Sequence, residues 1–110
     1  MTRATVRQGD VLIVPIDALP ENLTAVAPVR GRVVLAEGEA TGHAHTIEAE
    51  RADFFTADVL QEAERILMVH AGGAVVEHQE HSAITLEPGP YRVIRQVEWT
   101  DADEPVLQRD

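Results

Sequence analysis

Four of the five histidines in this chain lie in two short clusters. His43 and His45 belong to the segment TGHAH, and His78 and His81 belong to the segment EHQEH. Imidazole is the commonest protein ligand for metals such as zinc, iron, copper and nickel. Two histidines a few residues apart allow a small fold to present two such ligands at one point. The clusters therefore predict a metal centre, but they do not specify a reaction.

The spacing of the first cluster suits a strand. Successive side chains alternate between the faces of a strand, so His43 and His45 point the same way, about 6.6 Å apart along it. Rotamer changes can bring both rings onto one ion. Ile47 shares their face, which predicts that this face looks inward. The alternative is a pair of surface histidines, since an H-x-H pair often occurs by chance.

The second cluster has a spacing of three, which allows two geometries. In a straight strand His78 and His81 face opposite sides, and His78 and Glu80 would be the ligands. A turn or bulge at Gln79-Glu80 would instead bring both histidines together. The alternative without a metal is a solvated turn.

We expect both clusters to meet at one mononuclear site, because a domain of this size rarely supports two independent metal centres. We expect His78 more than His81 to be a ligand, since the alternation of side chains in a strand places it on the more apolar face. Glu80 is the reserve ligand if the strand is straight. The predicted metal ligands are His43, His45, His78 and His81. His70 stands alone and is expected to be structural or exposed.

The absence of cysteine excludes disulfides and thiolate metal sites. Any metal must therefore be held by nitrogen and oxygen ligands. Three histidines and one further group suit zinc, which we expect first; iron, manganese or nickel are alternatives if water completes the coordination shell. The chain carries no nucleophile elbow, P-loop, dinucleotide glycine motif or H-E-x-x-H helix, so the catalytic residues stay unassigned.

The formal net charge is −10, and all nine basic residues are arginine. Such a field repels phosphate backbones, so we expect no nucleic-acid partner. No segment resembles a signal peptide or is apolar for long enough to span a membrane. We therefore expect a cytoplasmic protein without a membrane partner, and a small-molecule ligand remains open.

Many short apolar runs between glycine and proline turns predict an all-β fold, a small single-domain β-barrel or sandwich with at most one short helix. Ala57 to Glu64 is the helical candidate, and 17–28 is expected to be a loop. Ala71-Gly72-Gly73 should join two strands of a hairpin. The strands are expected at 11–16, 32–36, 41–47, 52–56, 65–70, 74–78, 82–86 and 91–99.

We expect residues 1–110 to form one domain, with a frayed tail from about residue 100. A homo-oligomer is an open expectation, because edge strands such as 11–16 or 92–97 would be able to pair with a second copy.

His43-Ala44-His45 followed by Glu50 resembles the first metal motif of the cupins, an H-x-H pair followed by a glutamate. That resemblance implies a small β-barrel that holds a metal with histidines and a glutamate. The second cupin motif has its histidine after a P-x-G turn, whereas here both histidines of EHQEH precede Pro88-Gly89. The chain also resembles a group of small bacterial proteins with the pattern Gln8-Gly9-Asp10-Val11, TGHAH, EHQEH and PGPYRVIRQVEW, which implies no activity.

The predicted function is a small metal-binding all-β protein with a histidine-rich mononuclear site, and whether it is an enzyme is undecided. An enzyme needs an open coordination position, whereas a structural site is closed. The alternative is a non-enzymatic interaction or structural module, in which the histidines stabilise the fold or a subunit interface.

Overall fold

The computed structural model describes residues 3–37, 43–59, 62–95, 97–99 and 105–107. The elements in this part of the chain are all β-strands, which confirms the all-β prediction. No helix in it could cross a membrane. The strands are β1 (Val6–Gln8), β2 (Val11–Pro15), β3 (Leu23–Ala25), β4 (Arg32–Glu37), β5 (Ala44–Glu48), β6 (Ala52–Val59), β7 (Glu62–Val69), β8 (Ala74–Val76), β9 (Ile84–Leu86), β10 (Gly89–Arg95), β11 (Val97–Trp99) and β12 (Pro105–Leu107).

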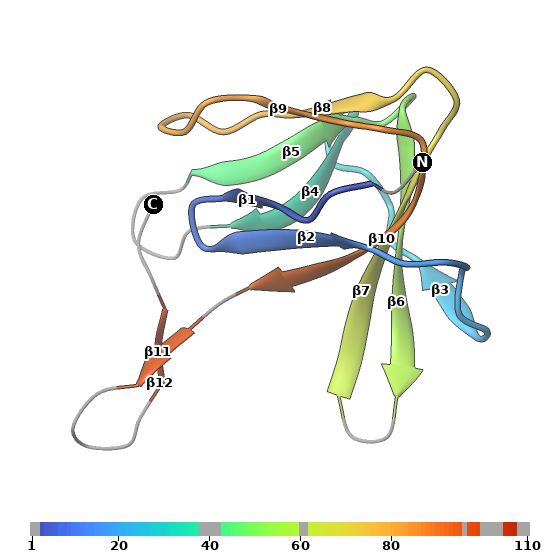
Figure 1. The fold of residues 1–110 in the computed structure, drawn as a ribbon, viewed down its shortest axis with the longest axis horizontal. Helices are drawn as coiled ribbons and strands as arrows, with labels where there is room; N and C mark the ends of the chain where they lie inside the picture. Colours follow the sequence, from blue (N-terminus) through green and yellow to red (C-terminus); the bar gives the residue numbers. More distant parts are fainter. Residues whose placement is uncertain (1–2, 38–42, 60–61, 96, 100–104, 108–110) are drawn as a thin grey trace.

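A six-stranded sheet forms one layer of the fold, in the order β1-β2-β10-β7-β6-β3 (Figure 1). Each pairing in it is antiparallel. β2 and β10 are internal strands of this sheet, so the prediction that they form free edges is wrong. The edges are β1 and β3.

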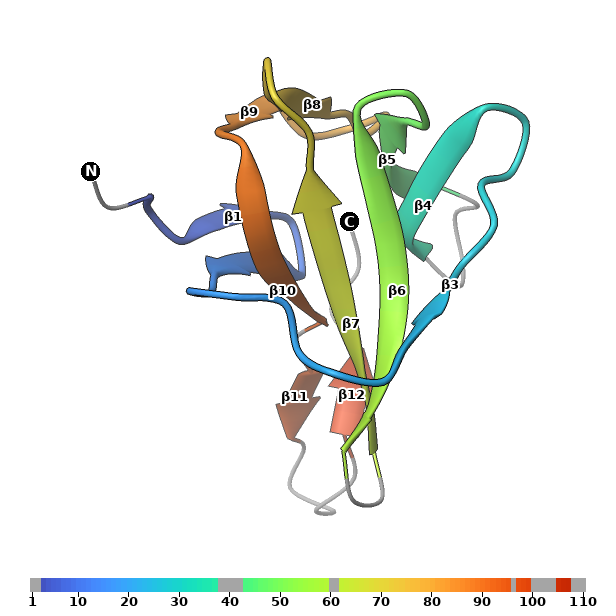
Figure 2. The same ribbon diagram turned by 90° about the vertical axis from the view of Figure 1, so that its right-hand side faces the viewer.

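Two short hairpins face this sheet. β4 pairs with β5, and β8 pairs with β9. An isolated bridge between Thr46 and Glu77 joins β5 to the end of β8, through hydrogen bonds of 2.9 and 2.8 Å. Figures 1 and 2 show these four strands together on one side of the molecule. In the described residues the pairings form separate sheets and do not close into one barrel.

One hydrophobic core lies between the two layers. The large sheet contributes Val11, Ile13 and Leu67, and the hairpins contribute Ile47 and Val76, all with no exposed surface. Burying a side chain of this size contributes about 1.5–3 kcal/mol. This core therefore fixes the hairpins against the sheet, and with them the histidines that they carry.

The helix predicted over Ala57 to Glu64 is wrong. β6 and β7 pair at every position from Ala52↔Val69 to Val59↔Glu62, so this segment belongs to an antiparallel hairpin. Continuous strand pairing outweighs the local helix preference of alanine, leucine and glutamate. Leu60 and Gln61 lie outside the described residues.

The loop predicted over 17–28 contains β3, which hydrogen-bonds the free side of β6. Three residues are too few to give a periodic signal, and neighbouring β6 determines their pairing. The long strand predicted over 91–99 is described as β10 and β11, with residue 96 outside the description. In the tail that was expected to be frayed, residues 105–107 form β12 and pair with β11. Residues 100–104 and 108–110 lie outside the described part of the chain.

The hairpin predicted between 65–70 and 74–78 is also wrong, because both edges of β7 are taken by β6 and β10. The chain leaves the large sheet at Gly72 and Gly73, which have φ values of 97° and 80°. It then enters the second layer as β8, which pairs with β9. This turn therefore carries the EHQEH segment toward β5.

We expect Gly73→Ala to destabilise the fold by more than Gly31→Ala. Both glycines have positive φ, a strain of about 1–3 kcal/mol for other residues. An added Cβ at Gly73 would lie 2.7 Å from the Leu86 carbonyl oxygen, whereas one at Gly31 meets nothing within 4 Å. Chemical denaturation of both variants measures the difference. Equal losses would mean that the close approach of this turn to β9 does not matter.

Candidate metal centre

The first histidine cluster is positioned by β5 and by a bulge in its partner strand. The β4–β5 register shifts between Val34 and Ala36, so that Ala36 pairs with His45. His45 and Ile47 are both buried, as expected for the inward face of a strand. His43, just before β5, has a side chain that is 26% exposed. One histidine is thus inside the fold and the other is at its edge.

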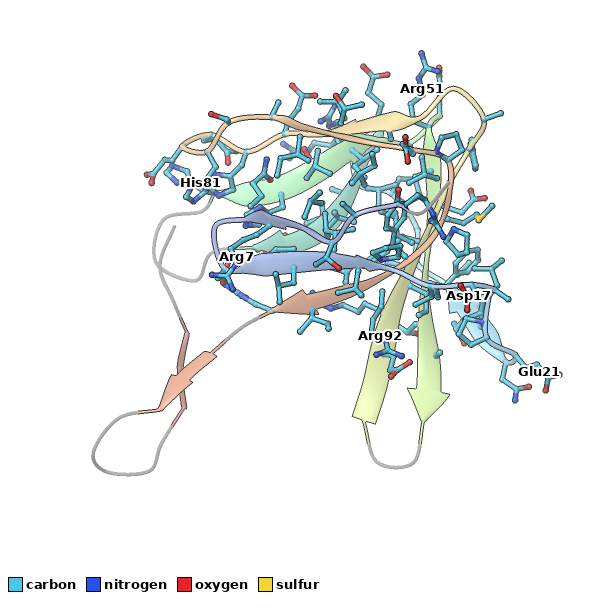
Figure 3. All side chains as sticks on the ribbon, in the orientation of Figure 1. Arg7, Asp17, Glu21, Arg51, His81 and Arg92 are labelled. Carbon is cyan, nitrogen blue, oxygen red and sulfur yellow. The ribbon has the colours of Figure 1, made fainter. Side chains whose placement is uncertain are left out.

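The second cluster lies in the connection between β8 and β9. The Thr46–Glu77 bridge holds its start against β5, and the Ala44 amide donates to Gln79 Oε1 at 2.9 Å. The backbone bends at residues 79–81. Of the straight strand and the turn at Gln79-Glu80, the structure therefore has the turn. Because of this bend, His81 does not face away from His78 as it would in a straight strand. Figure 3 shows His81 at the end of this connection, above the start of β5.

The structure brings all four rings together. The centroid of the His78 ring lies 4.3 Å from that of His45, 5.6 Å from that of His43 and 4.7 Å from that of His81. The rings of His45 and His81 are nearly parallel, at 6.3 Å. Residues more than thirty positions apart in the chain therefore form one imidazole cluster, which we call the histidine cluster.

A buried glutamine orients His45. Gln8 Nε2 donates to the carbonyl oxygens of Val76 and Ser82, at 3.1 and 2.9 Å. The amide nitrogen is therefore committed, and Gln8 Oε1 faces His45 Nδ1 at 2.8 Å. Because an amide oxygen only accepts, His45 Nδ1 must be the donor. When His45 is neutral, its Nε2 consequently carries the lone pair, as a metal ligand requires.

A buried carboxylate lies on the other side of His45. Asp10 has 1% of its surface exposed and accepts a 2.8 Å hydrogen bond from Arg95 Nε through Oδ2. Its Oδ1 lies 3.4 Å from His45 Nε2. Burial and the neighbouring Arg95 lower the pKa of Arg65, and Asp10 opposes that shift. Arg95 therefore pairs with this carboxylate, and Arg65 interacts with it electrostatically.

Sequence reasoning did not identify Gln8, Asp10 or Arg95 as parts of the site. Gln8-Gly9-Asp10 has the composition of an exposed turn, and Gly9 does have a φ of 59°. Only the tertiary arrangement, which places this turn at the same end as the start of β5 (Figure 1), buries its polar side chains. The weak signal available was that the same Q-G-D-V segment belongs to the pattern shared with the small bacterial proteins.

Glu80, the reserve ligand, lies beside a histidine. Its Oε1 is 3.1 Å from His43 Nδ1, a close contact whose geometry falls short of a hydrogen bond. The Glu80 amide donates to His78 Nδ1 at 3.0 Å. A carboxylate behind a histidine is a common way to orient that histidine toward a metal. The structure therefore gives Glu80 the position of an orienting group.

The glutamate of the cupin-like motif lies elsewhere. Glu50 is in the turn after β5, where its carbonyl oxygen accepts from His70 Nδ1 at 3.1 Å. Figure 3 shows neighbouring Arg51 at the top of the molecule, well to the right of His81. Glu50 therefore lies with His70 and away from the histidine cluster, so the structure does not support the ligand role that the cupin motif implies for it.

His70 is a structural residue, as expected. Its Nε2 is 2.9 Å from Asp53 Oδ2, and its other ring nitrogen faces the Glu50 carbonyl oxygen. Because both partners are acceptors, both ring nitrogens donate, which favours the imidazolium. The hydrogen bond with Asp53, followed by the one with Glu50, raises the pKa of His70.

We expect NMR titration to place the His70 pKa above the ordinary value of about 6.5, and Asp53→Asn to lower it. Since the folded-state pKa is raised, this histidine's contribution to stability is complete below the unfolded-state pKa. It is lost as the pH rises through the folded-state pKa. A His70 pKa that does not change in Asp53→Asn would mean that the pair is absent in solution.

A shallow hollow of about 320 Å³ adjoins the histidine cluster. It is lined by Arg32, Ala44, Thr46, Glu77, His78 and Gln79. Arg32 spans it, donating to Thr46 Oγ1 and Glu77 Oε1 at 2.9 and 2.8 Å. Solvent and small polar molecules can therefore approach His78 from this side.

The cluster does not yet form a coordination sphere. Among the residues that the structure describes, no three or more His, Asp or Glu side chains have donor atoms arranged to hold a metal ion. Hydrogen bonds with Gln8 and with the Glu80 amide engage Nδ1 of His45 and Nδ1 of His78, and the Glu80 carboxylate lies 3.1 Å from Nδ1 of His43. The four rings lie together, but their nitrogens do not point at one position. The less buried rings would have to rotate for their nitrogens to reach a common ion.

The fold is thus an all-β two-layer domain with a polar, histidine-rich end. The chain belongs to a family described as a domain of unknown function (DUF8820), whose model matches residues 7–96. This match includes the Q-G-D turn, both histidine clusters and Arg95. No match to a cupin family was found. Neither a curated protein nor a solved structure matches the chain.

Proposed function

We propose that this protein binds one divalent transition metal ion through His43, His45, His78 and His81. Zinc is the first candidate, and iron, manganese or nickel are the alternatives. The observation that carries the proposal is the gathering of four imidazole rings from two distant segments into one cluster. We place the protein in the cytoplasm, because the sequence shows no segment that resembles a signal peptide.

The ring spacing supports a shared ion. Imidazoles bound to one ion at about 2.0–2.1 Å have ring centroids roughly 4.5–5.5 Å apart. The separations of 4.3, 4.7 and 5.6 Å around His78 are close to that range. Rotations of the partly buried His43, His78 and His81 would complete the convergence, while Gln8 keeps His45 in place. For His78 the rotation must also release Nδ1, the nitrogen that bears the lone pair, from the Glu80 amide.

The chemistry available to such a centre is that of a Lewis acid, which polarises a bound oxygen atom and acidifies a bound water. The chain's own residues would orient the ligands. Gln8 fixes the tautomer of His45, and Glu80 lies behind His43. The hollow beside His78 gives a small polar molecule access to the site. These features suit a catalytic or a ligand-binding centre.

The second candidate is a structural module without a metal. The buried Gln8, His45 and Asp10 with the partly buried Arg95 favour it, because a protonated His45 could form an ion pair with Asp10. In that case the polar set would serve to fix the β1–β2 turn against β5. The other three histidines would then be partly buried groups at the edge of the fold.

Metal analysis separates the two candidates. Protein purified without a histidine tag and without chelators should contain about one zinc, iron, manganese or nickel ion per chain. A His70→Ala variant is the matched control, because it removes a histidine outside the cluster and should keep the metal. Protein that remains metal-free after incubation with each of these ions would contradict the proposal and favour the structural module.

A further inference from the structure

Asp10 is the buried group whose environment is least explained by folding alone. Arg95 satisfies Oδ2, but Oδ1 accepts no hydrogen bond from the described residues although it is fully enclosed. A buried carboxylate oxygen without a donor is costly, and such groups often mark a functional site. Oδ1 points toward His45 Nε2 at the base of the histidine cluster.

The distance between these two atoms is informative. Charge-assisted hydrogen bonds between nitrogen and oxygen are about 2.7–2.9 Å long. The 3.4 Å separation of Asp10 Oδ1 and His45 Nε2 is well beyond that. Two ligands at about 2.0–2.1 Å from a four- or five-coordinate ion are roughly 2.9–3.6 Å apart, depending on the angle between them. The pair therefore has the spacing of two ligands of one ion.

The tautomer of His45 leads to the same conclusion. Gln8 requires a proton on His45 Nδ1, so a neutral His45 directs the Nε2 lone pair at a carboxylate oxygen. Lone pairs in this arrangement repel each other unless a positive charge lies between them. That charge is either a second proton on His45 or a metal ion. The neighbouring ring of His78, 4.3 Å from that of His45, favours the metal.

We infer that Asp10 is a carboxylate ligand, through Oδ1, of the same ion that the histidine cluster binds. This inference rests on the proposed function and adds a fifth donor residue from the β1–β2 turn. Arg95 holds the other oxygen and so presents Oδ1 to the ion. A site of imidazoles and one carboxylate suits a hard or borderline divalent cation such as Zn²⁺, Fe²⁺ or Mn²⁺. Soft Cu⁺ is disfavoured.

The test is a competitive Zn²⁺ titration of the full chain against a chromogenic chelator. Asp10→Asn keeps the shape of the side chain and removes its charge, and we expect Zn²⁺ affinity to fall at least about a hundredfold. The control is Asp53→Asn, which removes a carboxylate paired with a histidine outside the cluster and should leave the affinity unchanged. The Co²⁺ absorption bands should also shift in Asp10→Asn and not in the control.

Asp10→Asn alone leaves Arg95 without its partner, so a second pair of variants separates the loss of the carboxylate from the loss of the ion pair. Arg95→Met keeps the carboxylate, and the double variant Asp10→Asn/Arg95→Met removes both charges together. We expect Arg95→Met to bind Zn²⁺ within about tenfold of the wild type, since it acts only behind a ligand. The double variant should lose binding as Asp10→Asn does.

Equal affinities of Arg95→Met and the double variant, with the same Co²⁺ spectrum, would overturn the ligand role of Asp10 and leave the proposed function intact. A wild-type protein that binds neither Zn²⁺ nor Co²⁺ would overturn both. The two failures are therefore distinguishable.

Discussion

Replacing His43 and His45 together with alanine should abolish stoichiometric metal binding. Both are proposed ligands: His45 lies on β5 and His43 immediately before it. His45 is the buried one, and Gln8 fixes the proton on its Nδ1. The remaining His78 and His81 lie on the β8–β9 connection, which offers no rigid strand to hold them. We expect metal content to fall from one ion per chain to none after dialysis, with an affinity loss of well over about a hundredfold.

The double variant must be shown to be folded, because His45 lies in the core region. Circular dichroism should retain the β-sheet spectrum, since the surrounding core of Ile47, Val76 and Leu67 is apolar and unchanged. A folded double variant that still purifies with one metal per chain would show that the metal is bound elsewhere.

The second large effect is a loss of stability in the variant Arg95→Met, measured on metal-free protein in the presence of a chelator. Removing the guanidinium leaves the Asp10 carboxylate buried without its 2.8 Å partner. Breaking a buried ion pair at one side costs about 3 kcal/mol or more of unfolding free energy. Urea denaturation measures the loss, and added zinc should reduce it if the ion compensates the charge of Asp10.

Arg92→Met is the matched control, from the same strand. Arg92 lies 3.6 Å from Glu64 with a side chain that is 44% exposed, so the pair is screened by solvent. Exposed pairs contribute about 0–1 kcal/mol, and we expect a change within that range. Similar losses for both arginines would mean that Asp10 is hydrated in solution.

The periodic parts of the fold could be predicted from the sequence. Runs such as those of β2, β4 and β10 combine β-branched residues with flanking glycine or proline, and these local signals persist in the structure. The predictions of a helix over Ala57 to Glu64 and of a hairpin after His70 are both wrong for one reason. Local composition does not reveal which strand edges are already occupied, and β7 is paired on both sides.

The histidine positions could likewise be predicted, because H-x-H spacing and strand parity are local properties. Sequence alone left the geometry at Gln79-Glu80 open, and the bend there depends on the Thr46–Glu77 bridge. The groups behind the histidines could not be predicted. Gln8 and Asp10 look like exposed turn residues, and only the packing of the β1–β2 turn beneath β5 buries them.

The most direct measurement is anomalous X-ray scattering from crystals of the untagged protein grown with zinc, collected at the zinc absorption edge. We predict one strong peak per chain among the rings of His43, His45, His78 and His81, within bonding distance of their nitrogens. A peak beside His70 alone, or no peak among the four rings, would contradict the shared metal site.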